Sequence, residues 1–131
     1  MNKAVRQCVL EADAKALATC GKGNINVVPV SFVKIVGENI WLIDFFMDKT
    51  IQNIIQNPQA SLVCWKNTMG YQLKGAVDYL QQGNLYDQAC EWVATTHPDR
   101  KVKGLIVLTP KEIFDVAPAK DTGERMGASW K

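Results

Sequence analysis

Lys49 and Thr50 have the side-chain types and the position to bind an anionic ligand. They follow a strand expected at 40–46 and begin a stretch in which three isoleucines recur at helical spacing. A helix N-terminus presents unpaired backbone N–H groups and the positive end of a dipole, so a lysine and a hydroxyl there suit a phosphate. Phosphate motifs this loose have many false matches, and the spacing alone also fits a solvated first helical turn.

Asp44 and Gln72 are polar residues in strands that otherwise read as apolar on at least one face. Asp44 follows four apolar residues, and a carboxylate at the end of a buried strand needs hydrogen-bond partners or takes up a proton. Backbone amides and Lys49 are two candidate partners. Gln72 lies on the polar face of an alternating strand at 71–79, where the alternative is a side chain that is merely solvated.

The elements that would position these residues are mostly strands joined by short turns. Helices are expected near the N-terminus, after Asp48 as a candidate N-cap, and after Asn84 as a second candidate N-cap up to the break at His97-Pro98. Inserted rather than alternating helices favour a mainly β fold, an antiparallel barrel whose closure removes exposed strand edges. We expect a single domain over 1–131, with a polar tail at 117–131. The six expected strands cover 16–20, 25–36, 40–46, 60–66, 71–79 and 104–116.

The composition limits the classes of partner and compartment. The chain has 131 residues, 47% of them hydrophobic, and a net charge of +2 with no run of basic residues, which argues against nucleic-acid and anionic-membrane binding. No segment approaches the length of about 20 apolar residues that a membrane span requires. Four scattered cysteines, expected to be buried, and one histidine give no zinc or iron–sulfur pattern, so we expect a cytoplasmic protein without a metal site.

The order of several segments resembles that of a known family. These segments are 31–36, 47–50, Asn57-Pro58 and 70–75, and they resemble the FMN-binding split-barrel proteins related to pyridoxamine 5′-phosphate oxidase. The small FMN-binding proteins of that group are the most similar in length and layout. The resemblance covers roughly residues 4–116, and it depends on the order and spacing of motifs that are each loose.

The resemblance implies a homodimer of six-stranded split β-barrels with two FMN molecules at the subunit interface. Lys49 and Thr50 would then hold the FMN phosphate. Trp130, a large aromatic residue in a polar tail, could stack on a flavin of either subunit. The other residues implied to contact FMN, along the ring, the ribityl chain or a ring heteroatom, are Val28, Pro29, Val30, Ser31, Asp44, Phe45, Phe46 and Gln72.

The resemblance also implies a function in which FMN carries the redox chemistry and no catalytic side chain is needed. The first hypothesis is an FMN-dependent oxidoreductase or electron carrier supplied by a nicotinamide nucleotide or a protein donor. The alternative is a module that binds or stores flavin, or another phosphorylated cofactor, without turnover. A barrel that binds oligonucleotides is a third class, which the near-neutral charge argues against. Three arginines, none in the central strands, argue against a pyridoxal-type substrate.

Overall fold

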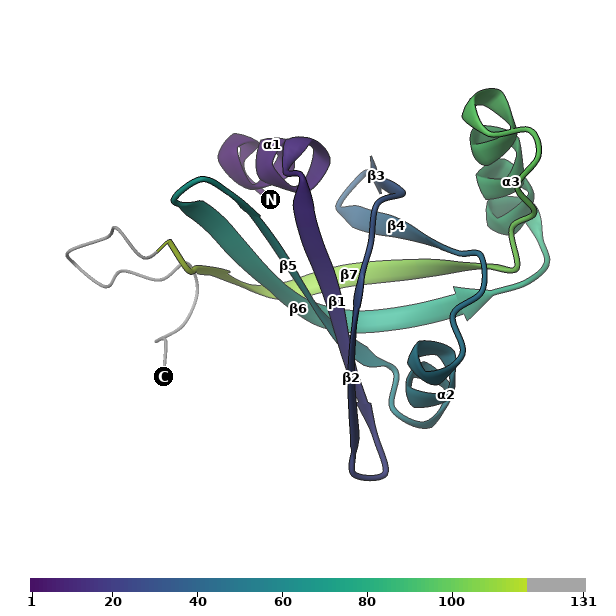
Figure 1. Cartoon of the computed structure of the whole chain (residues 1–131), viewed down its shortest axis with the longest axis horizontal. Helices are drawn as coiled ribbons and strands as arrows, with labels where there is room; N and C mark the ends of the chain where they lie inside the picture. Colours follow the sequence, from purple (N-terminus) through teal and green to yellow (C-terminus); the bar gives the residue numbers. More distant parts are fainter. Residues whose placement is uncertain (118–131) are drawn as a thin grey trace.

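Seven antiparallel strands form one sheet in the computed structural model, which describes residues 1–117 (Figure 1). The strand order is β2-β1-β5-β6-β7-β4-β3, so β2 and β3 are the two edges of the sheet. The strands are β1 (Ala14–Gly21), β2 (Asn24–Pro29), β3 (Val33–Val36), β4 (Asn39–Asp44), β5 (Gln59–Lys66), β6 (Met69–Leu80) and β7 (Gly104–Asp115).

The main core lies against one face of this sheet. Leu17 of β1, Leu62 of β5 and Leu73 of β6 are fully buried in it, together with Leu42 of β4 and Leu108 of β7. β1 and β4 stand far apart in the strand order, yet their side chains belong to one cluster. The sheet therefore curls around a common core, as the crossing of its strands in Figure 1 indicates.

Residues 1–117 form three helices, one before the first strand and two inserted between strands. Helix α1 (Lys3–Glu11) begins at Asn2, whose side chain accepts a hydrogen bond from the Val5 N–H. Helix α2 (Lys49–Gln56) packs against β1 and β2. Helix α3 (Asn84–Thr96) contacts β7 and belongs to a second apolar cluster, so it covers a different part of the sheet.

The prediction of six strands is wrong, because the segment 25–36 is two strands rather than one. β2 ends at Pro29, a residue that an edge strand accepts, and the chain leaves the sheet before β3. β3 then pairs with β4 through a turn in which Gly37 has a φ of 63°. The two strands end up at opposite edges of the sheet, so the expected closure, which would remove exposed edges, is also wrong.

One smaller prediction, the burial of all four cysteines, differs from the structure on the outer face of the sheet, the face turned away from the main core. Cys20 is exposed, whereas Cys8 and Cys64 are buried as expected. The Trp65 side chain is 46% exposed. Alternation along β1 and β5 turns Cys20 and Trp65 outward, away from the main core.

None of the helices within residues 1–117 is long and apolar enough to cross a membrane. Trp130, predicted to stack on a flavin, lies outside the described residues, as does the tail after Ala117.

Candidate cofactor site

A cavity of about 430 Å³ lies where the curled sheet stays open, between edge strand β2 and the segment that joins β4 to α2. We call it the seam pocket. It brings together predicted site residues that are up to 22 positions apart in the chain. Its lining includes the predicted residues Val28, Pro29, Val30, Ser31, Phe45, Phe46, Lys49 and Thr50.

The N-terminus of α2 forms one end of the seam pocket. Asp48 occupies the N-cap position, as predicted, but its side chain makes no capping hydrogen bond. Its carboxylate instead accepts a hydrogen bond of 2.9 Å from the Gln52 side chain. The backbone N–H groups of the first turn are therefore not satisfied by the cap residue and remain available to an anion.

Two polar contacts fix α2 against the first hairpin. Asn26 Nδ2 of β2 donates to Thr50 Oγ1 at 2.9 Å, and Thr50 is only 1% exposed. Asn53 Nδ2 donates to Thr19 Oγ1 of β1 at 3.2 Å. A hydroxyl that accepts one hydrogen bond still has its own proton to donate. Thr50 is thus held in place while it keeps a donor for a ligand, and the Lys49 side chain beside it is exposed.

The free edge of β2 contributes backbone groups to the seam. The Val30 N–H donates to the Lys15 carbonyl at 3.0 Å, so residue 30 directs its backbone toward β1. Hydrogen-bonded and non-hydrogen-bonded pairs alternate along an antiparallel ladder. The Val27 N–H and the Pro29 carbonyl therefore point away from β1, toward the open edge.

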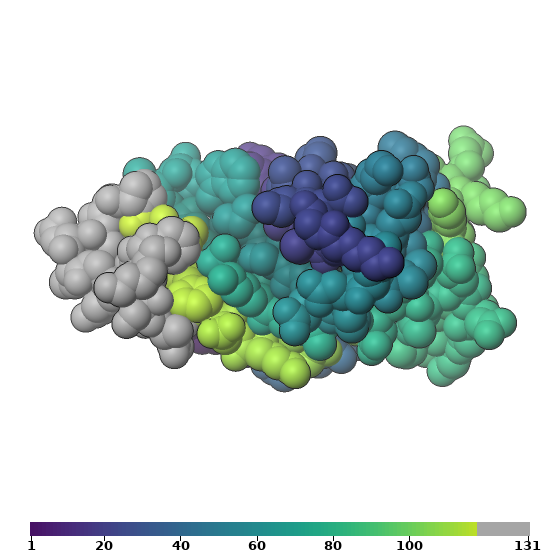
Figure 2. All heavy atoms as spheres, turned by 90° about the horizontal axis from the view of Figure 1, so that it is seen from below, coloured from purple at the N-terminus to yellow at the C-terminus, as the bar shows by residue number. Residues whose placement is uncertain are grey.

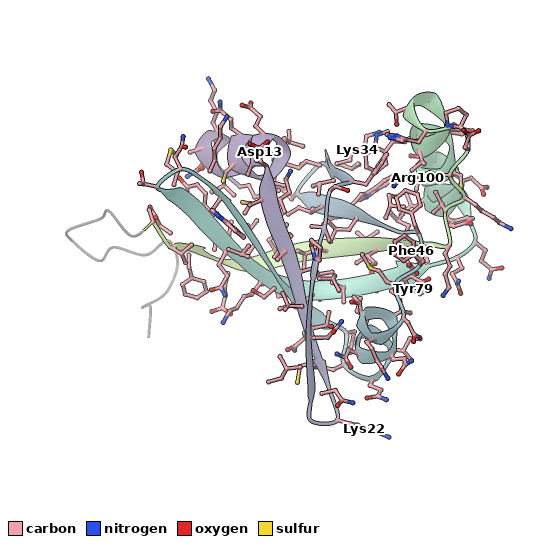
Figure 3. The ribbon with its side chains drawn as sticks, viewed as in Figure 1. Asp13, Lys22, Lys34, Phe46, Tyr79 and Arg100 are labelled. Carbon is pink, nitrogen blue, oxygen red and sulfur yellow. The ribbon has the colours of Figure 1, made fainter. Side chains whose placement is uncertain are left out.

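Aromatic side chains form the other end of the seam pocket. The rings of Phe32 and Phe45 meet edge to face with centroids 5.4 Å apart, and the Arg100 guanidinium lies 5.1 Å from the Phe45 centroid. Phe46 is 87% exposed, on the same side of the molecule as Arg100 (Figure 3). This end offers flat apolar surface and one cation to a planar ligand.

The structure does not place Asp44 or Gln72 among the residues that line the seam pocket. Asp44 is fully buried, and both of its carboxylate oxygens accept hydrogen bonds from within the chain. Burial and the neighbouring Asp44 raise the pKa of the Tyr79 hydroxyl above its usual value, so Tyr79 stays protonated as a donor. Gln72 is on the outer face of β6, and its Oε1 is shielded from solvent without a hydrogen-bond partner among residues 1–117.

Sequence reasoning missed several residues that line the seam pocket. Asn26 gave no signal, because a polar residue in an edge strand is ordinary. Arg100 follows the end of α3 and reaches the seam pocket only through the tertiary arrangement of that helix. The lining residues absent from the prediction are Asn26, Phe32, Ile43, Met47, Asp48 and Arg100.

Comparisons with known proteins agree with this geometry. The sequence model of the family described as pyridoxamine 5′-phosphate oxidase matches residues 1–117. An uncharacterized protein of Methanocaldococcus jannaschii is 31% identical over 120 residues, which cover 88% of this chain and 80% of that protein.

Two solved structures share the fold at low sequence identity. An FMN-binding protein of Syntrophomonas wolfei superimposes with a TM-score of 0.76 at 18% identity, over 88% of this chain and 86% of that one. HutZ, a heme storage protein of Vibrio cholerae, superimposes with a TM-score of 0.69 at 14% identity, over 86% of this chain and 92% of that one. Identities this low establish a common fold only.

Proposed function

The chain belongs to the pyridoxamine 5′-phosphate oxidase family, and on that premise we propose that it is a flavoprotein that binds FMN in the seam pocket. We propose further that it acts as an oxidoreductase or electron carrier. One observation carries the proposal: a cationic helix N-terminus and an aromatic wall line the same cavity. FMN has a phosphate at one end and a planar ring at the other, so it needs both kinds of surface in one place.

The residues at the α2 end suit the phosphate. Lys49 supplies a point charge, Thr50 a hydroxyl donor, and the uncapped first turn supplies backbone N–H groups and the helix dipole. Asn26 holds the Thr50 hydroxyl in place. The Asp48 carboxylate is the one unfavourable charge at this end among the described lining residues, and its hydrogen bond from Gln52 partly offsets it.

The opposite end suits the flavin ring. Val28, Val30 and Phe45 supply apolar surface, and the free edge of β2 supplies the Pro29 carbonyl as an acceptor for a ring N–H. The Val27 N–H points to the same edge, but Val27 does not line the seam pocket. The Pro29 carbonyl is a backbone group of a strand, so its position is fixed before a ligand arrives.

FMN supplies hydride or electron transfer when it is bound, and the protein then has to bind, orient and shield it. The exposed Phe46 and the Arg100 guanidinium stand at the open side of the seam pocket, where a nicotinamide nucleotide or a protein donor would approach. No side chain has to act as an acid or a base for this role. Arg100 favours a donor that carries negative charge.

We also propose a homodimer formed through the outer face of the sheet. Cross-strand register puts Pro29, Ala16, Val63, Gln72 and Phe114 in one row across five strands, which we call the outer row. Gln72 is its only polar member, and its buried Oε1 lacks a partner within residues 1–117. The other members of the row are apolar, as the core of a protein–protein interface is.

Exposed apolar side chains beside the outer row support the same proposal. Ile25 is 84% exposed and Val27 64% exposed, both on the first hairpin, which projects from the body of the protein toward the viewer in Figure 2. Trp65 on β5 adds a half-exposed aromatic ring. Contiguous exposed apolar groups of this kind mark interaction surfaces.

Storage of a cofactor without turnover is the second candidate, because HutZ shares the fold and is a heme storage protein. Heme iron is usually ligated by histidine, cysteine, methionine or tyrosine side chains. Among the described residues that line the seam pocket, only Met47 is of this kind. The lining therefore favours FMN over heme.

An absorbance experiment tests the proposal. Purified protein, or ligand-free protein given one equivalent of FMN, is expected to show the visible flavin spectrum after unbound ligand is removed, and hemin serves as the competing ligand. A preparation that retains hemin but not FMN would contradict the proposal. Anaerobic addition of NADH or NADPH then separates the two functions, because bleaching of bound flavin supports an oxidoreductase and stable flavin absorbance supports storage.

A further inference from the structure

Asp44 ends β4 as a fully buried carboxylate with both oxygens occupied. Its Oδ1 accepts the Met47 N–H at 2.6 Å, and its Oδ2 accepts the Tyr79 hydroxyl at 2.6 Å. Hydrogen bonds to a charged acceptor are short and stronger than neutral ones. We call this arrangement the Asp44 latch, made of the Asp44 carboxylate, the Tyr79 hydroxyl and the Met47 N–H.

Gly104 makes room for the latch. It faces Asp44 in the β4–β7 register, and a Cβ placed on it would lie 2.3 Å from the Tyr79 hydroxyl oxygen. The neighbouring Lys103 N–H also donates to the Asp44 carbonyl at 2.9 Å. Tyr79 reaches Asp44 only because residue 104 carries no side chain. Strands β4 and β6 thus meet at one carboxylate, and the start of β7 leaves the space that this contact needs.

The latch ends at the turn that leads into α2. Met47, whose N–H it holds, lies two residues before Lys49 and itself lines the seam pocket. The residues between Asp44 and α2 form neither strand nor helix. The hydrogen bond from the Met47 N–H to the Asp44 carboxylate therefore restrains this turn at the end that follows β4. Figure 3 shows Tyr79 and Phe46 on the same side of the molecule, between α2 and α3.

We propose that Asp44 and Tyr79 are positioning residues for the phosphate subsite: they do not touch the ligand but set its phosphate affinity by fixing the turn before Lys49. This inference rests on the proposed binding of FMN. It assigns the latch to the phosphate end of the ligand, because Phe45, which lies in the same turn, is also held by its ring contacts with Phe32 and Arg100, whereas Met47 is held by the Asp44 carboxylate. A purely structural role would stabilise the whole fold without distinguishing the two ends of a ligand.

Two ligands that differ only in the phosphate provide the test. Tyr79→Phe removes the latch hydroxyl and keeps the ring, and the dissociation constants of FMN and riboflavin are measured by flavin fluorescence. We expect the FMN constant to rise about tenfold, on the scale of one lost hydrogen bond to a charged group, while the riboflavin constant stays unchanged. Equal weakening of both ligands, or of neither, would overturn the inference.

Tyr86→Phe is the matched control. The Tyr86 hydroxyl donates to the Val102 carbonyl at 2.7 Å, so this variant also loses one tyrosine hydrogen bond, but in α3 and away from the turn. It should leave both constants as in the wild type. Gly104→Ala offers a second route, since the added methyl displaces Tyr79, and it should reproduce the FMN-specific loss.

Amide hydrogen exchange gives a measurement that needs no ligand. In Tyr79→Phe the Met47 N–H should exchange at least about tenfold faster than in the wild type, because its acceptor is less restrained. The amide of Ile54, in the body of α2, should be unaffected. If the exchange rate of the Met47 amide is unchanged in Tyr79→Phe, the latch does not restrain the turn, and the inference is wrong whatever the ligand measurements give. Failure of the wild type to bind FMN would instead contradict the proposed function.

Discussion

Thr50 illustrates how one side chain can serve both packing and binding. It is almost fully buried, yet it lines the seam pocket, because its environment is the interface between α2 and the first hairpin. Lys49, the adjacent residue, is exposed, so it contributes positive charge but its side chain is not held in one position. In the proposed site the pair would divide the work: Thr50 would fix where the phosphate sits, and Lys49 would increase the attraction.

Replacing Lys49 tests the contribution of that charge. Lys49→Gln should weaken FMN binding about tenfold, because a charge-assisted hydrogen bond to phosphate contributes about 1.5–3 kcal/mol and an exposed lysine delivers the lower end of that range. Riboflavin affinity should not change. Isothermal titration calorimetry measures both ligands.

Lys22→Gln is the matched control for Lys49→Gln, since it removes the same charge at the tip of the first hairpin, far from the seam pocket (Figure 3). An equal loss of FMN affinity in both variants would indicate a general effect of net charge. The phosphate assignment of Lys49 would then be wrong.

The buried thiol of Cys64 predicts a dependence of stability on alkaline pH. Burial, followed by the hydrogen bond to Cys8, raises the pKa of Cys64 from 9.0 to about 12. Between these values the folded thiol keeps a proton that the unfolded thiol has lost. The free energy of unfolding should therefore fall as pH rises through this window, by at most about 1.4 kcal/mol per pH unit.

Urea unfolding midpoints between about pH 8 and about pH 11 measure this slope. Cys64→Ala should make the slope shallower, although the variant is less stable at neutral pH because it leaves a cavity. Cys20→Ala, at an exposed thiol, should keep the wild-type slope. A Cys64→Ala slope that equals the wild-type slope would rule out Cys64 as the titrating group.

Individual elements were predictable where local chemistry decides them. The Asn2 cap, the turn at 21–24 and the two faces of β6 agree with the sequence pattern, since caps, glycines and alternation act over a few residues. The break after Pro29 was missed, because isoleucine and valine recur on both sides of the proline and suggest one continuous strand. Only the pairing of β3 with β4 separates the two strands, and pairing partners are not encoded within the segment.

The residues of the candidate site divide in the same way, into those with a local sequence signature and those that only the folded chain brings together. The Lys49-Thr50 turn could be recognised because helix N-termini have a local signature. Asp44 was correctly singled out as a buried carboxylate that needs partners, but its partners Tyr79 and Met47 come from the folded arrangement of β6 and the following turn. Arg100 was missed for the same reason, because it reaches Phe45 only through the path of the chain after α3.

The close backbone contact at Gly75 indicates that the pairing of β6 with β7 depends strongly on this one position. A Cβ on Gly75 would lie 1.9 Å from the Thr109 carbonyl oxygen, at the register shift in this ladder. Gly75→Ala should therefore destabilise the fold by about 3 kcal/mol, as an overpacked site against rigid backbone does. Urea unfolding measures the change.

Gly23→Ala is the comparison for Gly75→Ala. Gly23 has a φ of 81° with open space around it, so alanine there meets backbone strain alone and should cost about 1 kcal/mol. A Gly75→Ala variant that is no less stable than Gly23→Ala would show that β6 and β7 can separate locally at this position without a loss of stability.

At the scale of the whole molecule, the open sheet has two distinct surfaces with two proposed uses. The seam pocket, between edge strand β2 and the segment that joins β4 to α2, holds the candidate cofactor site, and the outer row lies on the opposite face of β1, β5 and β6. The first hairpin contributes to both, because alternate residues of β2 point to opposite faces. Assembly and cofactor binding are therefore expected to influence each other through β2.

A single charge on the first hairpin tests the proposed dimer. Val27→Lys should yield a monomer of half the wild-type mass in light scattering, because a lysine in the centre of an apolar interface would be desolvated. The side chain is 64% exposed in the isolated chain, so folding should be unaffected. Leu85→Lys, at an exposed apolar residue of α3, should keep the wild-type mass. A wild-type protein that is already monomeric would refute the dimer.

The uncapped N-terminus of α2 also has a consequence for the abundance of the protein. A phosphate on those N–H groups completes the helix, and a ligand that binds only the folded state stabilises it by about 2.7 kcal/mol at 100 times its dissociation constant. A stability gain of that size changes how much of a protein escapes proteolysis in a cell several-fold. The steady-state amount of this chain would then follow the supply of its cofactor, so that a shortage of FMN would lower the amount of the protein as well as its occupancy.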